Sequence, residues 1–365
     1  MNRKNQLQRN ILPITIDSLI TSECWTFYKF AVMQTTATYK DWLMDFMKVW
    51  TDEKGISFFG SPKERTQQSY YSDVLEIKDG HLLSRSPETI IDYIIDNIDS
   101  GYYVLLDVNY RRLYGDEQSF YLHEVLLYGY DRQKAIFYAP TLTSGFVEDV
   151  IPFEDLKCAF ADVLKYYRED HNNIFWRRYW TYGIMLLKPK EYHPDTDRYF
   201  EYIREIRDEI GGCVYQKNEG AVNHKWVTGL PAFSLLGDLF HKAYEDTEEN
   251  KENIFNLSRS CLKLYEHQTI LLESMQTFTE HLSAESELSC IISKYKNCVE
   301  KMHRIYLLCI KHSFTGDRQL LLRISEQLQK LESDEKEFLT EFDDQAAQRY
   351  IRKCLMPEPL NIESN

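Results

Sequence analysis

The chain has 365 residues, of which 43% are hydrophobic and 14% aromatic, so it carries enough apolar material for a sizeable core and is not globally disordered. Its formal net charge is −14 and no block of Lys or Arg stands out, which argues against nucleic-acid binding. No run of about eighteen apolar residues predicts a membrane span, and the length fits two domains of ordinary size.

The first residues and the cysteines indicate the expected compartment. The opening stretch MNRKNQLQRNILPITIDSLI lacks the apolar segment and small-residue cleavage site of a signal peptide. The eight cysteines are scattered, with no C-x-x-C pair and no spacing typical of metal ligands. His267, His281 and His303 lie far apart on expected helices. We therefore expect a cytoplasmic protein with free thiols and no bound metal or cofactor.

The first half of the chain mixes helix and strand patterns. Apolar spacing predicts helices over 24–34 and 39–50, and an isoleucine stripe from Ile90 to Ile98 predicts a third helix, with Ser86 as its N-cap and Pro87 at its first position. Strands are then expected over 101–110, 121–131, 135–139 and 179–190, with a strand running into a helix over 144–160. This order predicts an α+β domain over residues 1–190.

The second half reads as helix almost throughout. A helix over 197–210, a glycine-bearing loop over 211–224 and several long amphipathic segments predict an all-helical bundle domain over residues 195–355. The tail over 356–365 contains two prolines and little to bury, so we expect it to be disordered.

Two residues are candidates for nucleophilic chemistry. Cys24 is the only cysteine among the first 157 residues and opens an expected helix, whose positive end favours a thiolate, whereas Glu23 next to it works against one. His123 lies near the start of an expected strand and titrates in the range that a base needs. Taken singly, each residue is also explained by ordinary packing.

Together the two residues resemble a known arrangement. A cysteine on an early helix, a histidine on a later strand and the hairpin DVNYRRLYGDEQSFYLHEVLLYGYDRQKAIFYAPT resemble bacterial papain-like domains. These include leader-peptide-cleaving domains of bacteriocin transporters and the butirosin-biosynthesis protein H family of acyltransferases. The resemblance covers roughly residues 10–190. It implies a papain-like cysteine-protease-type fold and transfer of an acyl group from a carrier-protein thioester, through Cys24 with His123 as base, to an amine acceptor in antibiotic biosynthesis.

The chain departs from that pattern at two positions. Ala139 stands where the family has the Asp that orients the imidazole, and Ser18 stands where papain-like enzymes have the Gln of the oxyanion site. Asp107, on the preceding strand, is a candidate substitute for the missing acid. We expect Glu124 to point away from His123, because neighbouring strand residues alternate between faces.

Three functions therefore remain open. The first is the acyltransferase, with an acyl carrier protein or another acyl or peptidyl substrate as partner. The basic pairs Arg111–Arg112 and Arg177–Arg178 are candidates to meet an acidic carrier or its phosphate. The second is a peptidase or amide hydrolase with water as acceptor. The third is a catalytically degenerate binding or scaffold protein, which Ala139 favours. The sequence leaves the oligomeric state open.

Overall fold

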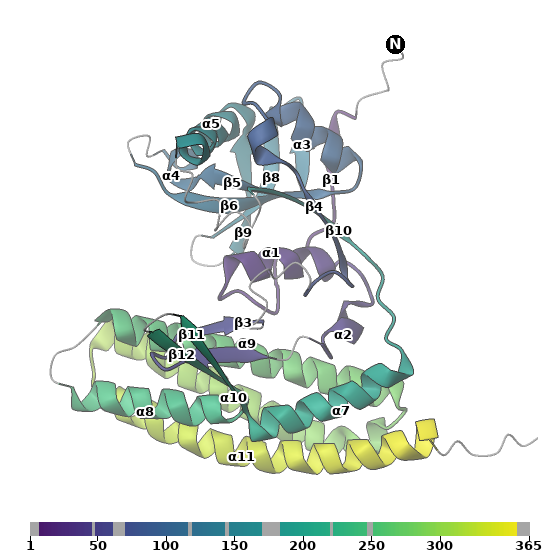
Figure 1. The fold of residues 1–365 in the computed structure, drawn as a ribbon, viewed down its shortest axis with the longest axis vertical. Coiled ribbons are helices and arrows are strands. Elements are labelled where there is room, and N and C mark those ends of the chain that lie inside the picture. The colour runs from purple at the N-terminus through teal and green to yellow at the C-terminus, as the bar shows by residue number, and fades with distance from the viewer. Residues whose placement is uncertain are drawn as a thin grey trace, which may run out of the picture. The chain divides into compact units, whose positions relative to one another are not determined.

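The computed structural model describes residues 7–45, 48–60, 70–115, 119–142, 146–169, 183–219, 222–246 and 251–355 (Figure 1). The chain divides into two compact units, one formed by Met1–Tyr39 with Glu64–Tyr192 and the other by Lys40–Lys63 with His193–Asn365. Residues 40–63, which we expected in the first domain, therefore belong to the second unit. The tail over 356–365 and the pair Arg177–Arg178 lie outside the described residues.

The first unit is a mixed α and β structure with two four-stranded antiparallel sheets, in the orders β1-β7-β8-β9 and β4-β10-β5-β6. Its strands are β1 (Arg9–Ile11), β4 (Leu75–Asp79), β5 (Tyr103–Asn109), β6 (Leu122–Leu127), β7 (Gly129–Asp131), β8 (Ile136–Leu142), β9 (Phe146–Pro152) and β10 (Ile184–Pro189). Its helices are α1 (Cys24–Met33), α3 (Ile90–Asp99), η1 (Leu82–Ser84), α4 (Tyr110–Leu113) and α5 (Phe153–Glu169), and α2 (Tyr39–Trp42) spans the boundary to the second unit.

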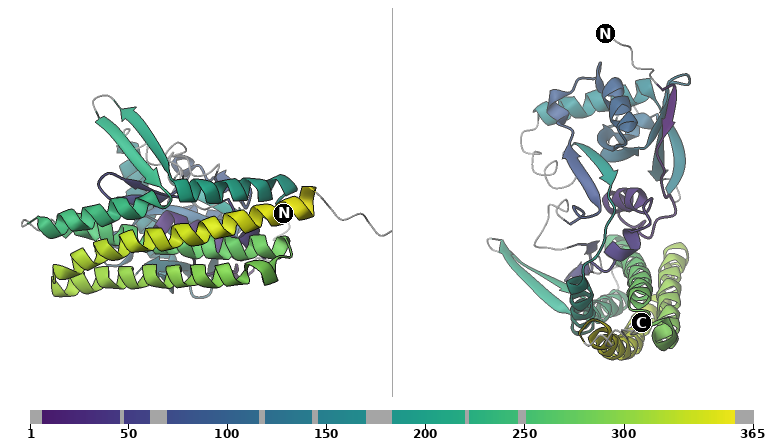
Figure 2. Two further views of the ribbon diagram at one scale, coloured as in Figure 1. Left: turned by 90° about the horizontal axis from the view of Figure 1, so that it is seen from below. Right: turned by 90° about the vertical axis from the view of Figure 1, so that its right-hand side faces the viewer.

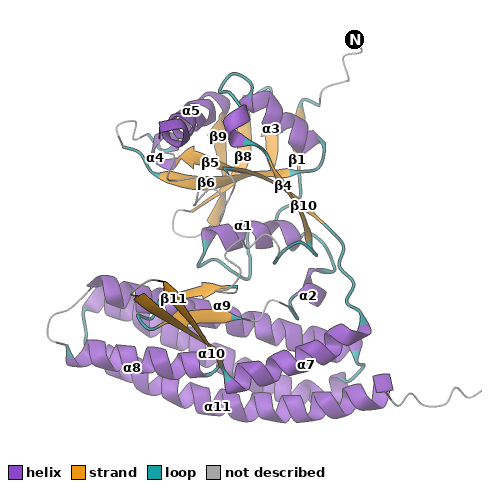
Figure 3. Ribbon diagram, viewed as in Figure 1, coloured by secondary structure: helices purple, strands orange, loops and turns teal. Residues whose placement is uncertain are grey.

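The helices of this unit form where apolar side chains can be buried against its core. In α3, Ile90, Ile94, Ile95 and Ile98 are all buried and pack with β5 and α5 in one hydrophobic core (Figure 3). The expected stripe is confirmed, although the helix starts at Ile90 and its N-cap is Thr89 instead of Ser86. α1 is buried from Thr26 through Met33, as an apolar run without a polar face requires.

The segment expected as one strand over 121–131 serves both sheets of the first unit. β6 pairs with β5, whereas β7 pairs with β1 and β8, and Tyr128 joins the two strands. Gly129 is required at this point because a Cβ there would lie 2.9 Å from the carbonyl oxygen of Asn10. His123, near the start of β6, therefore lies on an edge strand of its sheet.

The second unit joins long helices to a small antiparallel sheet of order β11-β12-β2-β3. Its helices are α7 (Thr196–Gly211), α8 (Pro231–Glu245), α9 (Lys251–His281), α10 (Glu285–Thr315), α11 (Gln319–Tyr350) and the short η3 (Ile351–Leu355). α11 packs along α8 and α10, and α10 packs along α9 (Figure 2). The described residues contain no helix with the length and apolarity needed to cross a membrane.

The sheet of the second unit corrects two expectations. Residues 211–224 do not form a loop: β11 (Cys213–Glu219) and β12 (Val222–Thr228) form a hairpin. The helix expected over 39–50 ends at Trp42, and β2 (Val49–Asp52) and β3 (Ser57–Phe59) follow it. β2 is a strand because it pairs with β12 from the far half of the chain, a contact that helical spacing cannot reveal.

A buried polar cluster lies among the long helices of the second unit. Glu335 on α11 is fully buried and accepts hydrogen bonds from Tyr295 on α10, at 2.6 Å, and from Gln268 on α9. Nearby, His267 on α9 and Glu209 on α7 are buried and lie 3.0 Å apart. Burial raises the pKa of Glu335 to about 7, because a charged carboxylate is poorly solvated there, and the two hydrogen bonds offset only part of this effect.

This raised pKa predicts a pH dependence of stability. Since the folded state holds the Glu335 proton more tightly than the unfolded chain, its contribution is full below about pH 4.5 and is lost as the pH rises through about 7. Glu335→Gln should remove roughly 3 kcal/mol of pH dependence from the free energy of unfolding over that range. Urea titrations followed by circular dichroism across this pH range measure the difference. Equal slopes in the two proteins would contradict the assignment.

Candidate active site

Cys24 is the first residue of α1, and its thiol is partly accessible. Glu23 before it is the N-cap, in an extended conformation, and its carbonyl accepts the N–H of Phe27 at 2.8 Å. The first N–H groups of a helix have no carbonyl of their own helix to bind, so the N–H of Cys24 points from a positive helix end. This position suits both a nucleophile and a donor to an oxyanion.

The structure brings His123 to Cys24. The two side chains interact, since a hydrogen bond and a charge of Cys24 both contribute to the raised pKa of His123, although the residues lie about a hundred positions apart in the chain. The Nδ1 atom of His123 lies 2.8 Å from the carbonyl oxygen of Glu124. A carbonyl only accepts, so Nδ1 carries a proton and donates it, which leaves Nε2 for Cys24. The backbone of β6 thus sets the tautomer and orientation of the ring.

The pKa of His123 is raised to about 9. Burial is the largest influence and lowers this pKa, but four contributions outweigh it: the hydrogen bond with Cys24, the charges of Glu124 and Cys24, and the hydrogen bond to the Glu124 carbonyl. Only 18% of the side chain is exposed. At neutral pH the ring is therefore protonated on both nitrogens and carries a positive charge beside the Cys24 side chain.

Glu124 contributes its side chain as well as its carbonyl. Its Oε2 atom lies 4.0 Å from Nδ1 of His123, so the expectation that it points away from the ring is wrong. The contact is possible because Nδ1 already lies 2.8 Å from the carbonyl oxygen of Glu124, within reach of the flexible carboxylate of the same residue. Tyr28 of α1 donates its hydroxyl to the same carbonyl at 3.2 Å. One backbone oxygen therefore binds both α1 and the imidazole.

Two buried charged side chains, Glu23 at the N-cap of α1 and Lys29 within the helix, lie on the same helix as Cys24. Glu23 is buried, and its carboxylate accepts a hydrogen bond from Thr26 at 3.0 Å. Lys29 is also buried, donates to the carbonyl of Trp25 at 2.9 Å and lies over the ring of Tyr71. Burial lowers the pKa of Lys29 to about 8, while the carboxylates of Glu124 and Glu23 act in the opposite direction. The ammonium group of Lys29 partly offsets the negative charge that Glu23 places beside Cys24.

Tyrosines surround the imidazole. The ring centroids of Tyr110 and Tyr121 lie 5.1 and 5.7 Å from that of His123. The hydroxyl of Tyr110 lies 2.9 Å from that of Thr141 on β8. A tyrosine thus joins the ring to β8, the strand that carries Ala139. Ala139, two residues earlier on β8, is 1% exposed and belongs to the hydrophobic core of the first unit.

The other residues singled out from sequence have different partners. Asp107 on β5 is buried and accepts a hydrogen bond from Tyr167 at 2.6 Å. The Ser18 hydroxyl accepts from the N–H of Ile20 at 3.4 Å. Arg112 pairs with Asp162 at 3.4 Å. Within the described part of the chain, no group of three His, Cys, Asp or Glu side chains is arranged to hold a metal ion.

Sequence reasoning missed Tyr28 and Tyr110 and dismissed Glu124. Tyr28 follows Cys24 by four residues, so helical spacing places both on one face of α1, a signal available from sequence. The role of the Glu124 carbonyl had no such signal, because every residue has a carbonyl and only the path of β6 decides which one meets the ring.

The coupling of the pair can be tested by titrating His123. NMR of the labelled protein should give a His123 pKa near 9. Cys24→Ala should lower it most, and Glu124→Gln should lower it less, because the latter keeps the backbone carbonyl. Glu154→Gln, which removes an exposed carboxylate of α5, is the matched control and should have no effect. A wild-type pKa that Cys24→Ala leaves unchanged would contradict the coupling.

A second test concerns the position of the missing acid. Ala139→Asp should place a carboxyl group in the hydrophobic core and lower the free energy of unfolding by roughly 1–3 kcal/mol. Val150→Asp, which introduces the same carboxyl group at an exposed position of β9, should have little effect. Chemical denaturation measures both. A stable Ala139→Asp protein with a more reactive Cys24 would show instead that position 139 can orient the ring.

Neither a protein family model nor a curated protein matches this chain.

Proposed function

We propose that the chain is a cysteine-dependent acyltransferase whose first unit has a papain-like fold. In this proposal Cys24 takes an acyl group from a carrier-protein thioester, as in the butirosin-biosynthesis protein H family, and passes it to an amine of a specialised metabolite. The observation that supports it best is the interaction of Cys24 with His123, which raises the pKa of the imidazole, together with the Nδ1 atom of that ring held by the Glu124 carbonyl.

The reaction divides into two steps that share one intermediate. The Cys24 sulfur, its proton transferred to Nε2 of His123, attacks the thioester carbonyl and forms a tetrahedral oxyanion. Collapse of this oxyanion breaks the carbon–sulfur bond to the carrier, whose thiol leaves with the proton from His123. The amine then attacks the acyl-cysteine and gives its proton to His123, and collapse releases the amide and the Cys24 sulfur. No oxidant or metal is needed.

The oxyanion needs donors at the start of α1. The N–H of Cys24 is the first donor, since it belongs to the helix end. We assign Ser18 as a candidate second donor, in the place of the papain-like glutamine. The hydroxyl of Ser18 accepts from Ile20, and its own hydrogen is therefore available to point elsewhere.

The loss of the acid at position 139 does not remove the orienting function in this proposal. An orienting acid holds the imidazole in one tautomer and stabilises its charged form. Here the carbonyl of Glu124 holds the tautomer at 2.8 Å, and its carboxylate, at 4.0 Å, supplies the negative charge. Both come from the residue next to the histidine instead of from β8.

A non-catalytic binding or scaffold protein is the second candidate. The observation that favours it is Ala139, which is packed in the core where the family pattern has its acid. A peptidase or amide hydrolase would use the same acyl-enzyme with water as acceptor. These candidates differ in one measurable property, the fate of an acyl group on Cys24.

The deciding experiment follows Cys24 by intact-protein mass spectrometry. Iodoacetamide at neutral pH should modify Cys24 first, and His123→Ala should slow this modification by roughly tenfold or more, because the protonated imidazole stabilises the thiolate that attacks the reagent. Cys290, an exposed thiol on α10, is the internal reference and should react at an unchanged rate in both proteins. Equal slow labelling of Cys24 and Cys290 would favour the scaffold.

An acyl-thioester of N-acetylcysteamine then separates the two enzymes. The transferase should gain the acyl mass on Cys24, keep it in buffer, and lose it with amide formation when a primary amine is added. Cys24→Ala should gain no mass. Rapid loss of the acyl group in buffer alone would indicate a hydrolase and would contradict the transferase.

A further inference from the structure

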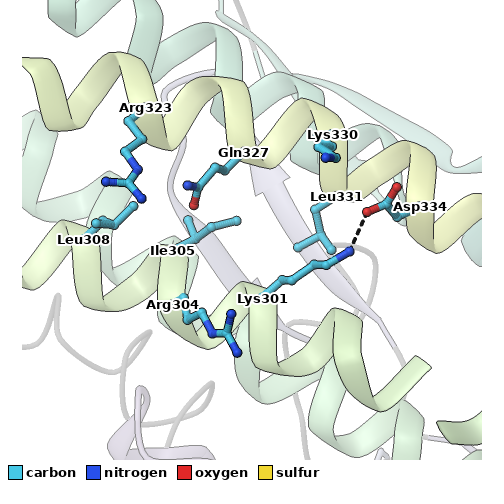
Figure 4. A pocket seen from close by; sticks show the side chains of 9 residues that line it. All are labelled: Lys301, Arg304, Ile305, Leu308, Arg323, Gln327, Lys330, Leu331 and Asp334. Atoms are coloured by element: carbon cyan, nitrogen blue, oxygen red, sulfur yellow. Dashed lines mark hydrogen bonds and ion pairs between the residues drawn. The ribbon is translucent and has the colours of Figure 1, made fainter. Parts of the chain in front are cut away.

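A groove runs between α10 and α11 of the second unit (Figure 4). None of the residues that line it belongs to the candidate site around Cys24. Its volume is about 310 Å³. Ile305 and Leu331 are both 1% exposed and form its floor together with the half-buried Leu308. Because the two helices pack directly on each other, this floor is a fixed part of the bundle.

The rim of the groove is positive, although the chain as a whole carries a charge of −14. Four cations line it, Lys301 and Arg304 from α10 and Arg323 and Lys330 from α11, against one carboxylate, Asp334. Four positive charges and one negative charge leave a net charge of +3. Cations gathered in one groove of an acidic protein produce a local field that favours an anionic partner.

Only part of this positive charge is neutralised within the chain. Lys301 pairs with Asp334 at 2.7 Å (Figure 4). Arg304 lies 3.8 Å from Glu300, an exposed pair of little strength. Within the described residues, Arg323 and Lys330 make no ion pair. The α11 side of the rim therefore holds two cations that are available to an external partner.

The spread of the cations indicates what kind of anion fits. Figure 4 shows Arg323 at the end near Leu308, and Lys330 and Lys301 toward the other end. A single phosphate group would be bound by cations that converge on one point. Here the lining residues of α11 extend from Arg323 to Asp334, which is about 16 Å along a helix. An elongated ligand with several negative charges matches this distribution better than a compact one.

The apolar floor indicates that the ligand has apolar groups as well as negative charges. A partner must present apolar side chains to the accessible part of this floor, which is the half-buried Leu308 and the aliphatic stems of the cations, and carboxylates to their charged ends. An amphipathic helix with apolar residues at i, i+4 and i+7 and acidic residues beside them has this pattern, and a groove between two packed helices is a common seat for such a helix. We propose that the α10–α11 groove docks an acidic amphipathic helix of a protein partner.

The proposal can be tested with a designed probe. The probe is a fluorescein-labelled, hydrocarbon-stapled peptide of about four helical turns, with Leu at i, i+4 and i+7 and Glu flanking each Leu. Fluorescence anisotropy with the full chain should show saturable binding that weakens as salt is added. The double variant Arg323→Glu/Lys330→Glu should reduce the affinity at least about tenfold, because it places like charges opposite the probe.

Matched controls separate docking from general charge attraction. Lys311→Glu/Lys336→Glu changes the same two helices and the net charge by the same amount at exposed positions outside the groove, and should bind the probe as wild type does. A peptide with the same residues and scrambled Leu positions should bind at least about tenfold more weakly, since it cannot cover the floor. Thermal unfolding of both double variants checks that they fold.

Three results would overturn the proposal: no binding of the probe, equal loss of binding in the two double variants, or equal binding of the scrambled peptide.

A separate experiment measures the binding of inorganic pyrophosphate by calorimetry. If it binds and the groove variant alone loses it while the helical probe does not bind, the groove takes a small anion and the helix proposal is wrong. The outcome does not depend on the acyl-transfer chemistry, because none of these measurements involves Cys24.

Discussion

The candidate site depends on one backbone atom, the carbonyl oxygen of Glu124. It accepts the Nδ1 proton of His123 at 2.8 Å and the hydroxyl of Tyr28 at 3.2 Å, so it joins the edge strand β6 to α1, the helix that begins with Cys24. A carbonyl has two lone pairs and can satisfy both donors. Because a backbone atom moves only with its strand, this arrangement fixes the imidazole more firmly than an exposed side chain would.

The rest of the first unit supports the position of that strand. β5 is buried along its full length and pairs with β6, while α3 and α5 bury apolar faces against the same core. On the other side of the site, α1 is held by its buried run and by the stacking of Phe27 on Phe146 of β9. Cys24 and His123 are therefore placed by elements whose own positions are set by apolar packing.

Sequence patterns predicted the elements that depend on local spacing and missed those that depend on distant pairing. The stripe from Ile90 to Ile98 and the buried strand β5 are visible within ten residues of chain. β2 is a strand because it pairs with β12 across a long interval, whereas β11 and β12 form a local hairpin that sequence reasoning missed because the glycines of this segment indicate a loop. The same division applies to the site: residue type indicated Cys24 and His123, whereas only the fold determines which oxygen orients the imidazole.

The assignment of residues 40–63 to the second unit has a consequence for how the protein is made. β2 and β3 emerge from the ribosome early, but β12 and Ser260, which bind them, are synthesised much later. The folding of the two units is therefore linked. The first unit must fold while residues 40–63 still lack their partners, and the second can be completed only when α9 has been synthesised. During that interval the edge of β2 that later pairs with β12 is unpaired, and an unpaired strand edge is a site for misassociation.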